Sequence, residues 1–331
     1  MLEHTSILIP VLPGRAPYLA PALRLFADET PEVQIIVGAM DSAYGEVCAL
    51  AEAGRLGNLH VCQHDSKVAY HLRLKDLRAQ ARGRFLVIHP DDDIMDPVMM
   101  AACEEFLLAN PDYSAAMGRA LRVSRGRDPS GTEAFQVSAY PVWSHEQATP
   151  RERILHLFQH YHHLWYSLQR ADSVDLRLHH IALFEGDPMF SQYLDACVPV
   201  AVGRTKVLEG IGFIRRLHDQ NTGTRMGAQR DPNVFPHLMF NPAFSQRYAH
   251  FRNLVLDLVA GASMAANILV DPESLREELD LRSLQLLRWG LFLERGRVEP
   301  GEERFLANLR DPRTADGARA QKLLAAMWSL G

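Results

Sequence analysis

Three consecutive carboxylates directly follow a short apolar run in this sequence of 331 residues. The run Phe85–Ile88 has the β-branched and aromatic side chains of a buried strand, and Pro90 cannot donate a ladder hydrogen bond, so the strand should end there. Asp91, Asp92 and Asp93 then lie at the carboxyl end of a strand, where open α/β sheets bind ligands. Adjacent carboxylates repel one another, and Mg²⁺ or Mn²⁺ would relieve that repulsion while bridging to a diphosphate. The acids therefore indicate a site for a divalent metal ion.

The alternative is an acidic loop that only precedes a helix. Asp96 is a good N-cap residue, and Pro97 would then occupy the first helical position. A run of like charges is commonly a solvated surface segment. The residues alone leave both interpretations open.

Composition limits the class of protein. Hydrophobic residues make up 47% and charged residues 23% of the chain, as in a globular protein with one large or two ordinary domains. The net charge of −5 argues against a nucleic-acid partner. Cys48, Cys62, Cys103 and Cys197 are widely spaced, which favours free thiols in the reducing cytoplasm. We expect neither a signal peptide nor a transmembrane segment.

The elements around the acids alternate in type. Hydrophobic patterning predicts strands at 6–11, 33–38, 59–62 and 83–88, and helices at 18–28, 46–54 and 70–81. This order predicts βαβ units and a mostly parallel sheet. A helix at 97–109, a strand at 114–123, a loop at 125–132 and a helix at 150–161 should follow. A glycine-rich loop after the first strand is missing, which argues against a Rossmann dehydrogenase or a P-loop NTPase.

The last third of the chain should be helical. We expect helices at 243–269, 271–279, 283–295, 302–309 and 318–330. Leu284, Leu287 and Leu291 give one of them an apolar face, which should pack on the α/β domain. A homodimer interface and a docking surface for a carrier are the alternatives.

The succession of strand, helix, strand ending in an acid, helix, strand, lysine-bearing helix, strand and Asp-Asp-Asp resembles the nucleotide-sugar glycosyltransferases of GT-A fold, in their family-2-like branch. The likeness covers roughly residues 5–220 and is carried by the motifs as a set. It implies a Rossmann-like α/β catalytic domain at 1–235, with a mostly parallel central sheet flanked by helices, and an all-helical C-terminal extension at 236–331.

The same resemblance implies an activity. The enzyme would use Mg²⁺ or Mn²⁺ and transfer a sugar, with inversion, from a nucleotide-diphosphate sugar to a hydroxyl of a glycan, a lipid-linked molecule or a protein. It would act in polysaccharide biosynthesis in the cytoplasm, alone or at the inner face of the membrane. A non-catalytic nucleotide- or sugar-binding module and a nucleotidyltransferase are the alternatives.

The likeness also suggests roles for residues of the first half. The nucleotide and donor would contact Pro10, Val11, Asp41, Lys75, Asp91 and Asp92. The common acidic motif is Asp-x-Asp-Asp, whereas Pro90 stands here at the place of its first acid. Among the three acids we favour Asp91 and Asp93 as metal ligands, with His218 as a third.

In the second half, the likeness places the sugar and acceptor beside His163, Trp165 and Tyr166. Asp187 would be the catalytic base, although Gly186 replaces the acid that usually precedes it. Arg215 or Arg216 would add positive charge near the diphosphate.

Each of these residues also has an ordinary structural interpretation. Asp187 could simply cap a helix that begins at Pro188, and His218 could be a surface residue. Trp165 and Tyr166 could belong to the core. His156 and His160 would share a helix face and could bind zinc, but a third ligand would have to come from elsewhere.

Overall fold

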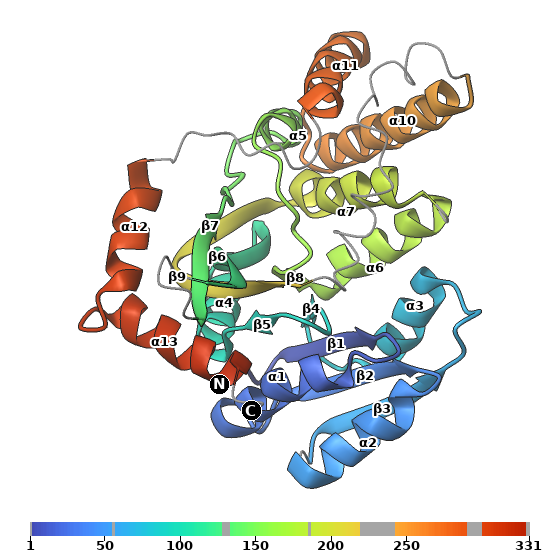
Figure 1. The fold of residues 1–331 in the computed structure, drawn as a ribbon. Helices are drawn as coiled ribbons and strands as arrows, with labels where there is room; N and C mark the ends of the chain where they lie inside the picture. Colours follow the sequence, from blue (N-terminus) through green and yellow to red (C-terminus); the bar gives the residue numbers. More distant parts are fainter. Residues whose placement is uncertain are drawn as a thin grey trace.

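The computed structural model describes residues 2–54, 57–127, 133–184, 187–218, 242–289 and 300–328. Its centre is a nine-stranded sheet with the order β3-β2-β1-β4-β8-β6-β9-β5, and β7 pairs with β6. Figure 1 shows helices on both faces of this sheet. The pairings give one common direction to β1, β2, β3, β4, β6 and β9, whereas β5, β7 and β8 oppose it. The mostly parallel sheet expected from the sequence is confirmed.

The first half of the chain builds the parallel part. Its strands are β1 (Thr5–Val11), β2 (Gln34–Met40), β3 (Leu59–His64) and β4 (Phe85–Ile88). Its helices are α1 (Ala16–Glu29), α2 (Ala43–Gly54) and α3 (Tyr70–Gln80). Successive side chains of β1 point to opposite faces, so Ile7 and Ile9 pack with α1, while Leu8 packs with α3. A continuous apolar run is therefore needed, because both faces are covered.

The second half extends the sheet. It contains β5 (Ile94–Met95), α4 (Pro97–Ala109), β6 (Tyr113–Arg127), β7 (Glu133–Tyr140), α5 (Pro150–Gln159), β8 (Leu168–Arg170), α6 (Ala171–Ile181), the 3₁₀ turn η1 (Ala182–Phe184), α7 (Pro188–Val202) and β9 (Arg204–Leu217). β6 and β9 cross closely where Gly118 faces Gly212, and a Cβ on Gly118 would lie 2.7 Å from the nitrogen of Gly212. Glycine is required there because two backbones meet.

Several expectations for this half were wrong. β6 continues to Arg127 through the start of the predicted loop, and β7 begins at Glu133, so this segment is largely a hairpin. The helix α6 was not predicted. Its sequence is rich in polar and charged residues, and it is helical because Val174 and Leu178 pack on the sheet beside α3.

From residue 242 to residue 328, the described ranges form the helices α10 (Pro242–Ala265), α11 (Pro272–Trp289), α12 (Pro300–Arg310) and α13 (Ala315–Trp328). The predicted break near residue 281 is wrong, because α11 is continuous there. The proposed domain boundary at 235 and the side chains of Leu284, Leu287 and Leu291 lie outside the described residues.

These helices pack on the α/β part of the molecule in two places. α10 and α11 pack against α5 and α7, and α13 packs against α1 and β9. Figure 1 shows the two groups at different ends of the sheet. Arg319 of α13 pairs with Glu29 at 2.6 Å and also contacts Asp96, the N-cap of α4. The C-terminal helices thus contribute to the same packed structure as the sheet.

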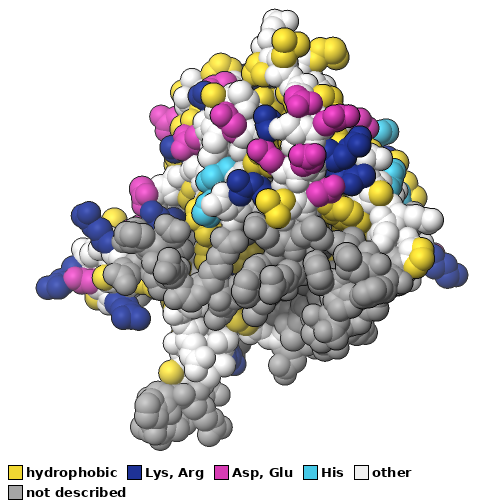
Figure 2. Space-filling model, turned by 90° about the horizontal axis from the view of Figure 1, so that it is seen from above, with side chains coloured by type: hydrophobic (Ala, Val, Ile, Leu, Met, Phe, Trp, Pro, Cys, Tyr) yellow, Lys and Arg dark blue, Asp and Glu magenta, His cyan; other side chains and the backbone are white. Residues whose placement is uncertain are grey.

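The described residues contain no helix that is both long and apolar enough to cross a membrane. On the face drawn in Figure 2, basic and acidic side chains lie next to one another. Two ion pairs join the helices α5, α10 and α11: Arg151 of α5 pairs with Glu278 of α11 at 3.0 Å, and Arg252 of α10 pairs with Asp280 of α11 at 2.9 Å.

Candidate active site

Asp91, Asp92 and Asp93, called the acid triplet below, follow β4 and precede β5. They are only 7%, 7% and 3% exposed. β4 lies between β1 and β8 in the sheet, so the triplet lies at the carboxyl edge of the parallel strands. Asp96 does cap α4, since its side chain accepts a hydrogen bond from the nitrogen of Val98 at 2.9 Å. The triplet itself is buried, which excludes the interpretation as a solvated surface loop.

The turn after β1 holds two of these acids. The backbone nitrogen of Leu12 donates to Oδ2 of Asp91 at 2.9 Å. Nη1 of Arg15 lies 3.4 Å from Oδ1 of Asp91 and also contacts Oδ2 of Asp92. Arg15 is 5% exposed, so a buried guanidinium group balances part of the triplet's charge. Sequence analysis missed Arg15, although it follows a strand end just as the acids do.

The third acid is held by β9. The backbone nitrogen of Arg216 donates to Oδ1 of Asp93 at 2.7 Å. The side chain of Arg216 in turn donates to the carbonyl of Met327 in α13 at 2.8 Å. The negative charges of Asp93 and Asp92 act on Arg215, whose predicted contact with the diphosphate stays a prediction. β5 pairs with β9 through Ile94 and Ile214, and this pairing brings the two segments together.

His218, at the end of β9, reaches the triplet. Its Nε2 lies 3.0 Å from Oδ2 of Asp92, and its ring stacks on Tyr18 with centroids 4.6 Å apart. Burial lowers the pKa of His218, while the hydrogen bond to Asp92 partly offsets this effect. A neutral imidazole can ligate a metal ion. The structure therefore brings His218 to Asp92, whereas the sequence favoured Asp91 and Asp93 as its fellow ligands.

Burial changes the protonation of the triplet. Desolvation and the neighbouring charge of Asp92 raise the pKa of Asp91 to about 6, although Leu12 and Arg15 act in the opposite direction. Burial, followed by the charge of Asp92, also raises the pKa of Asp93. Both shifts have the same physical cause, because taking a carboxylate out of water disfavours its charged form. A cation entering the site would stabilise the ionised acids.

The residues fit a divalent metal ion in their chemistry. Carboxylates and a neutral imidazole are ligands of Mn²⁺, and two ligand atoms 3.0 Å apart match neighbouring positions around one ion. As they are arranged, no three His, Cys, Asp or Glu side chains within the described ranges surround a common point. The acids instead share their oxygens with Arg15, Arg216 and Leu12. A metal ion would require these side chains to rearrange.

Two tyrosines line the same region. Tyr166 stacks on Phe213 of β9 with centroids 3.7 Å apart, and burial and the charge of Asp93 raise its pKa. Tyr140, at the end of β7, is coupled to Arg215 and hydrogen-bonds to the backbone of His163. Tyr166 therefore lies near the triplet, and the backbone of His163 contacts Tyr140, a residue that the sequence did not suggest. The predicted contacts of His163 and Tyr166 with the sugar and acceptor stay predictions.

Trp165 has a different environment. Its ring stacks on Tyr70 with centroids 5.8 Å apart, and the guanidinium of Arg177 lies 4.8 Å from its centroid. Arg177 is 1% exposed and pairs with the buried Asp195 of α7. Trp165 also packs in the apolar cluster below β1 and β4. These contacts are those of a core residue that joins α3, α6 and α7.

Asp187 is the N-cap of α7. Its Oδ1 accepts from the nitrogen of Phe190 at 3.3 Å, and its Oδ2 lies 2.9 Å from Nη1 of Arg247 in α10. α7 leads into β9 through Gly203 alone and packs on that strand, so the N-terminus of α7 points toward the carboxyl edge of the sheet. Glu185 and Gly186 lie outside the described residues.

The residues proposed to contact the nucleotide differ in how deeply they are buried. Val11 is buried and Pro10 half-buried at the end of β1. Asp41 follows β2 with φ of 44°, is exposed, and accepts from the nitrogen of Ser66 at 3.3 Å. Lys75 lies on the exposed face of α3. The buried cation of that helix is Arg73, which sequence analysis did not select, and it contacts Met40 and Tyr70.

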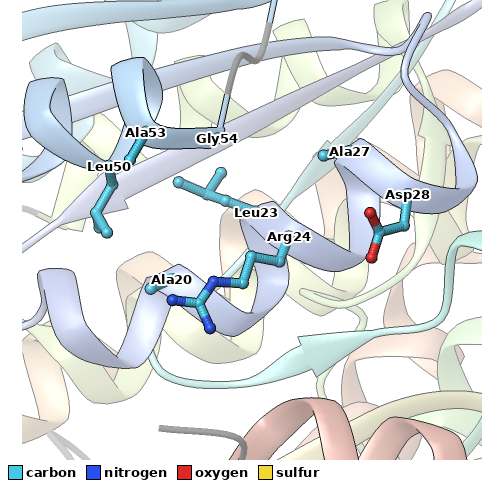
Figure 3. A pocket seen from close by; sticks show the side chains of 8 residues that line it. All are labelled: Ala20, Leu23, Arg24, Ala27, Asp28, Leu50, Ala53 and Gly54. Carbon is cyan, nitrogen blue, oxygen red and sulfur yellow. The ribbon is translucent and has the colours of Figure 1, made fainter.

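A shallow groove lies away from the triplet, between α1 and α2. It has a volume of about 330 Å³ and is lined by Ala20, Leu23, Arg24, Ala27, Asp28, Leu50, Ala53 and Gly54. Figure 3 shows Arg24 and Asp28 on one side of an otherwise small and apolar lining.

Four histidines gather near the other end of β9, and His145, His156, His160 and His162 are called the histidine cluster below. Nδ1 of His145 lies 2.8 Å from Nδ1 of His156, and the rings of His145 and His162 stack at 5.3 Å. Burial lowers the pKa of His162 to about 4, although the backbone of His160 acts in the opposite direction, and neither ring nitrogen of His162 meets a partner in strict hydrogen-bond geometry. The three-ligand arrangement needed for zinc is not found among the described side chains.

No protein-family model matches this sequence, and no curated protein sequence matches it. Solved structures do resemble the fold. For residues 1–349 of S. aureus TarS, the TM-score is 0.50 at 12% identity, over 96% of this chain and 82% of that one. The TarS complex with UDP-GlcNAc gives a TM-score of 0.48 at 12% identity, over 98% and 81%. The mannosyltransferase PcManGT from Pyrobaculum calidifontis, in complex with GDP-Man and Mn²⁺, gives 0.44 at 12% identity, over 99% and 88%.

TarS is a GT-A-type glycosyltransferase, and its likeness to this chain extends over most of both proteins. An identity of 12% bears on the fold alone. Together with the mostly parallel sheet, the flanking helices and the C-terminal helices, it confirms the expected architecture. This chain therefore has a GT-A-type fold.

Proposed function

We propose that this protein is a metal-dependent, inverting glycosyltransferase that uses a nucleotide-diphosphate sugar. The observation that carries the proposal is the buried acid triplet at the carboxyl edge of a GT-A sheet, within reach of His218 and among Arg15, Arg215 and Arg216. Such a combination suits a ligand that brings both a divalent cation and a diphosphate. The acceptor would be a hydroxyl of a glycan, a lipid-linked molecule or a protein.

Asp92 and His218 are the first ligands we assign to Mg²⁺ or Mn²⁺, with Asp91 or Asp93 completing the protein's share. When bound, the ion would neutralise charge on the departing nucleoside diphosphate. Arg215 and Arg216 would add positive charge beside that group, and Tyr166 would border the sugar. Val11 at the end of β1 would line the nucleotide pocket, with Asp41 contacting the nucleoside.

Asp187 is our choice for the base that removes the proton of the acceptor hydroxyl. Because Arg247 pairs with one of its oxygens, base catalysis requires that ion pair to open when the acceptor binds. Asp187→Asn should lower kcat about 10²- to 10⁴-fold, the usual contribution of a general base, while donor affinity changes less than twofold. Isothermal titration of the donor and initial rates would separate the two effects. A loss of donor affinity as large as the loss of kcat would contradict this role.

A non-catalytic nucleotide-sugar-binding module is the second candidate. It is favoured by the ion pair of Asp187 with Arg247, which leaves the proposed base engaged. The module would bind the donor with metal but would neither transfer nor hydrolyse it. Release of nucleoside diphosphate distinguishes the two functions. The transferase cleaves the bound donor and releases nucleoside diphosphate, whereas the binding module does not.

The primary test is a thermal-shift screen of UDP-, GDP-, CMP- and dTDP-sugars, each with and without Mn²⁺. UDP-GlcNAc and GDP-mannose are included. A ligand that binds only the native state raises Tm. At a ligand concentration 100 times Kd, the free energy of unfolding increases by about 2.7 kcal/mol. We expect a shift with one nucleotide that requires Mn²⁺. If no nucleotide raises Tm, both the transferase and the binding module are overturned.

A further inference from the structure

Arg15 occupies an unusual position for an arginine, inside the acid triplet rather than on the surface. It is the N-cap residue of α1, its backbone nitrogen donates to the carbonyl of Leu12 at 3.1 Å, and Gly14 before it has φ of 75°. This tight turn fixes its backbone at the carboxyl end of β1. The side chain then reaches Asp91 and Asp92 while remaining 5% exposed.

Cationic side chains already lie against the triplet among the described residues. Nη1 of Arg15 contacts Asp91 and Asp92, and the positive charges of Arg215 and Arg216 also act on Asp92 and Asp93. A divalent cation that enters this buried region alone adds positive charge beside these guanidinium groups, which is costly in a medium of low dielectric constant. A diphosphate brings negative charge that offsets this cost. These charges therefore favour the joint entry of metal and diphosphate over entry of the metal alone.

We infer that Arg15 is an internal counter-ion that competes with the divalent metal for Asp91 and Asp92, and that it turns to the donor's diphosphate when metal and donor enter together. The inference rests on the function proposed above and adds that the metal ion and the donor bind together rather than the metal ion first. Its geometric basis is that Arg15 contacts the same oxygen of Asp92 that faces His218, so one oxygen serves both the guanidinium group and the imidazole ring. A metal ion bound between Asp92 and His218 must displace the guanidinium group or share that oxygen with it.

The test measures Mn²⁺ binding with no nucleotide present, by electron paramagnetic resonance of the free ion, at fixed ionic strength. Arg15→Gln removes the competing charge, and we expect it to bind Mn²⁺ at least tenfold more tightly than the wild type. Arg24→Gln is the matched control, because Arg24 lies on the exposed face of the same helix and carries the same charge. It should bind Mn²⁺ as the wild type does.

Arg15→Lys provides a second variant that keeps the charge but lacks the planar fork, and its affinity for Mn²⁺ should lie between those of the wild type and Arg15→Gln. Circular dichroism first establishes that each variant is folded. Equal Mn²⁺ affinity in the wild type and every folded Arg15 variant would overturn the inference. That result leaves the nucleotide screen on the wild type intact, so a failure of the counter-ion and a failure of the transferase are distinguishable.

Discussion

The acid triplet and the histidine cluster are two buried groups of potential metal ligands in very different surroundings. Burial favours the neutral form of both the acids and the histidines. It raises the pKa of Asp91 to about 6 and lowers the pKa of His162 to about 4. The triplet nevertheless meets cationic groups, hydrogen-bond donors and His218. In the histidine cluster, the pKa of His145 is lowered first by burial and then by the neighbouring histidines His162, His156 and His160.

This difference separates a site for charged ligands from a packed group of rings. Carboxylates that are buried among arginines form ion pairs with them, and a charged ligand can replace one partner of such a pair. Neutral imidazoles that stack on one another and pack at tilted angles against Trp143 mainly fill space. Changes in the triplet should therefore affect binding, and changes in the histidine cluster should affect stability.

The largest expected effect is loss of donor binding in Asp93→Asn. The variant keeps the shape of the side chain but removes a charge that couples to Arg215 and accepts from Arg216. Interactions of charged groups contribute about 1.5–3 kcal/mol, so affinity for donor with Mn²⁺ should fall about 100-fold. Calorimetric titration measures it. Unchanged affinity, with the wild-type Tm, would place the donor elsewhere.

A smaller effect is expected on stability in acid. A histidine whose folded pKa is depressed binds fewer protons when folded, so its contribution to stability is complete above the unfolded pKa of about 6.5 and is lost as pH falls toward 4. From pH 7 to pH 5, His162 alone should cost about 2 kcal/mol. Within the described part of the chain, the titratable side chains that act on His162 are His145 and His156, and Arg282 acts on His156.

His162→Gln should reduce this pH dependence by about the same 2 kcal/mol, because glutamine does not titrate. Urea denaturation at pH 7 and pH 5 gives the two free energies of unfolding for each protein. The donor affinity of the variant at pH 7 should equal that of the wild type. A parallel decline of wild type and variant between the two pH values would show that His162 is not buried in its neutral form.

The smallest effect is predicted for Lys75→Ala. Sequence analysis placed Lys75 at the donor, but its side chain projects from the exposed face of α3, so donor affinity should change less than twofold. Arg73→Gln is the matched comparison on the same helix, because Arg73 is 6% exposed beside Met40 at the end of β2. A larger loss with Lys75→Ala than with Arg73→Gln would restore the sequence-based assignment.

Local patterns predicted most of the strands and helices that hold the triplet. The apolar run Phe85–Ile88, the proline after it and the cap at Asp96 each act over a few residues, and all three appear in the structure. The hairpin of β6 and β7 and the helix α6 were missed. The side chains of β7 are largely exposed, so its pairing with β6, rather than an apolar pattern of its own, makes it a strand.

The fold class, the carboxyl-edge position of Asp91 to Asp93 and the helical end of the chain could be predicted from local patterns, because they depend on periodicity and short-range turn chemistry. Only the tertiary structure decided which partners the acids have. Arg15 is 77 positions from Asp92, Arg216 is 123 from Asp93 and His218 is 126 from Asp92. Contacts over such separations depend on the order and register of β1, β4, β5 and β9, which no local pattern specifies.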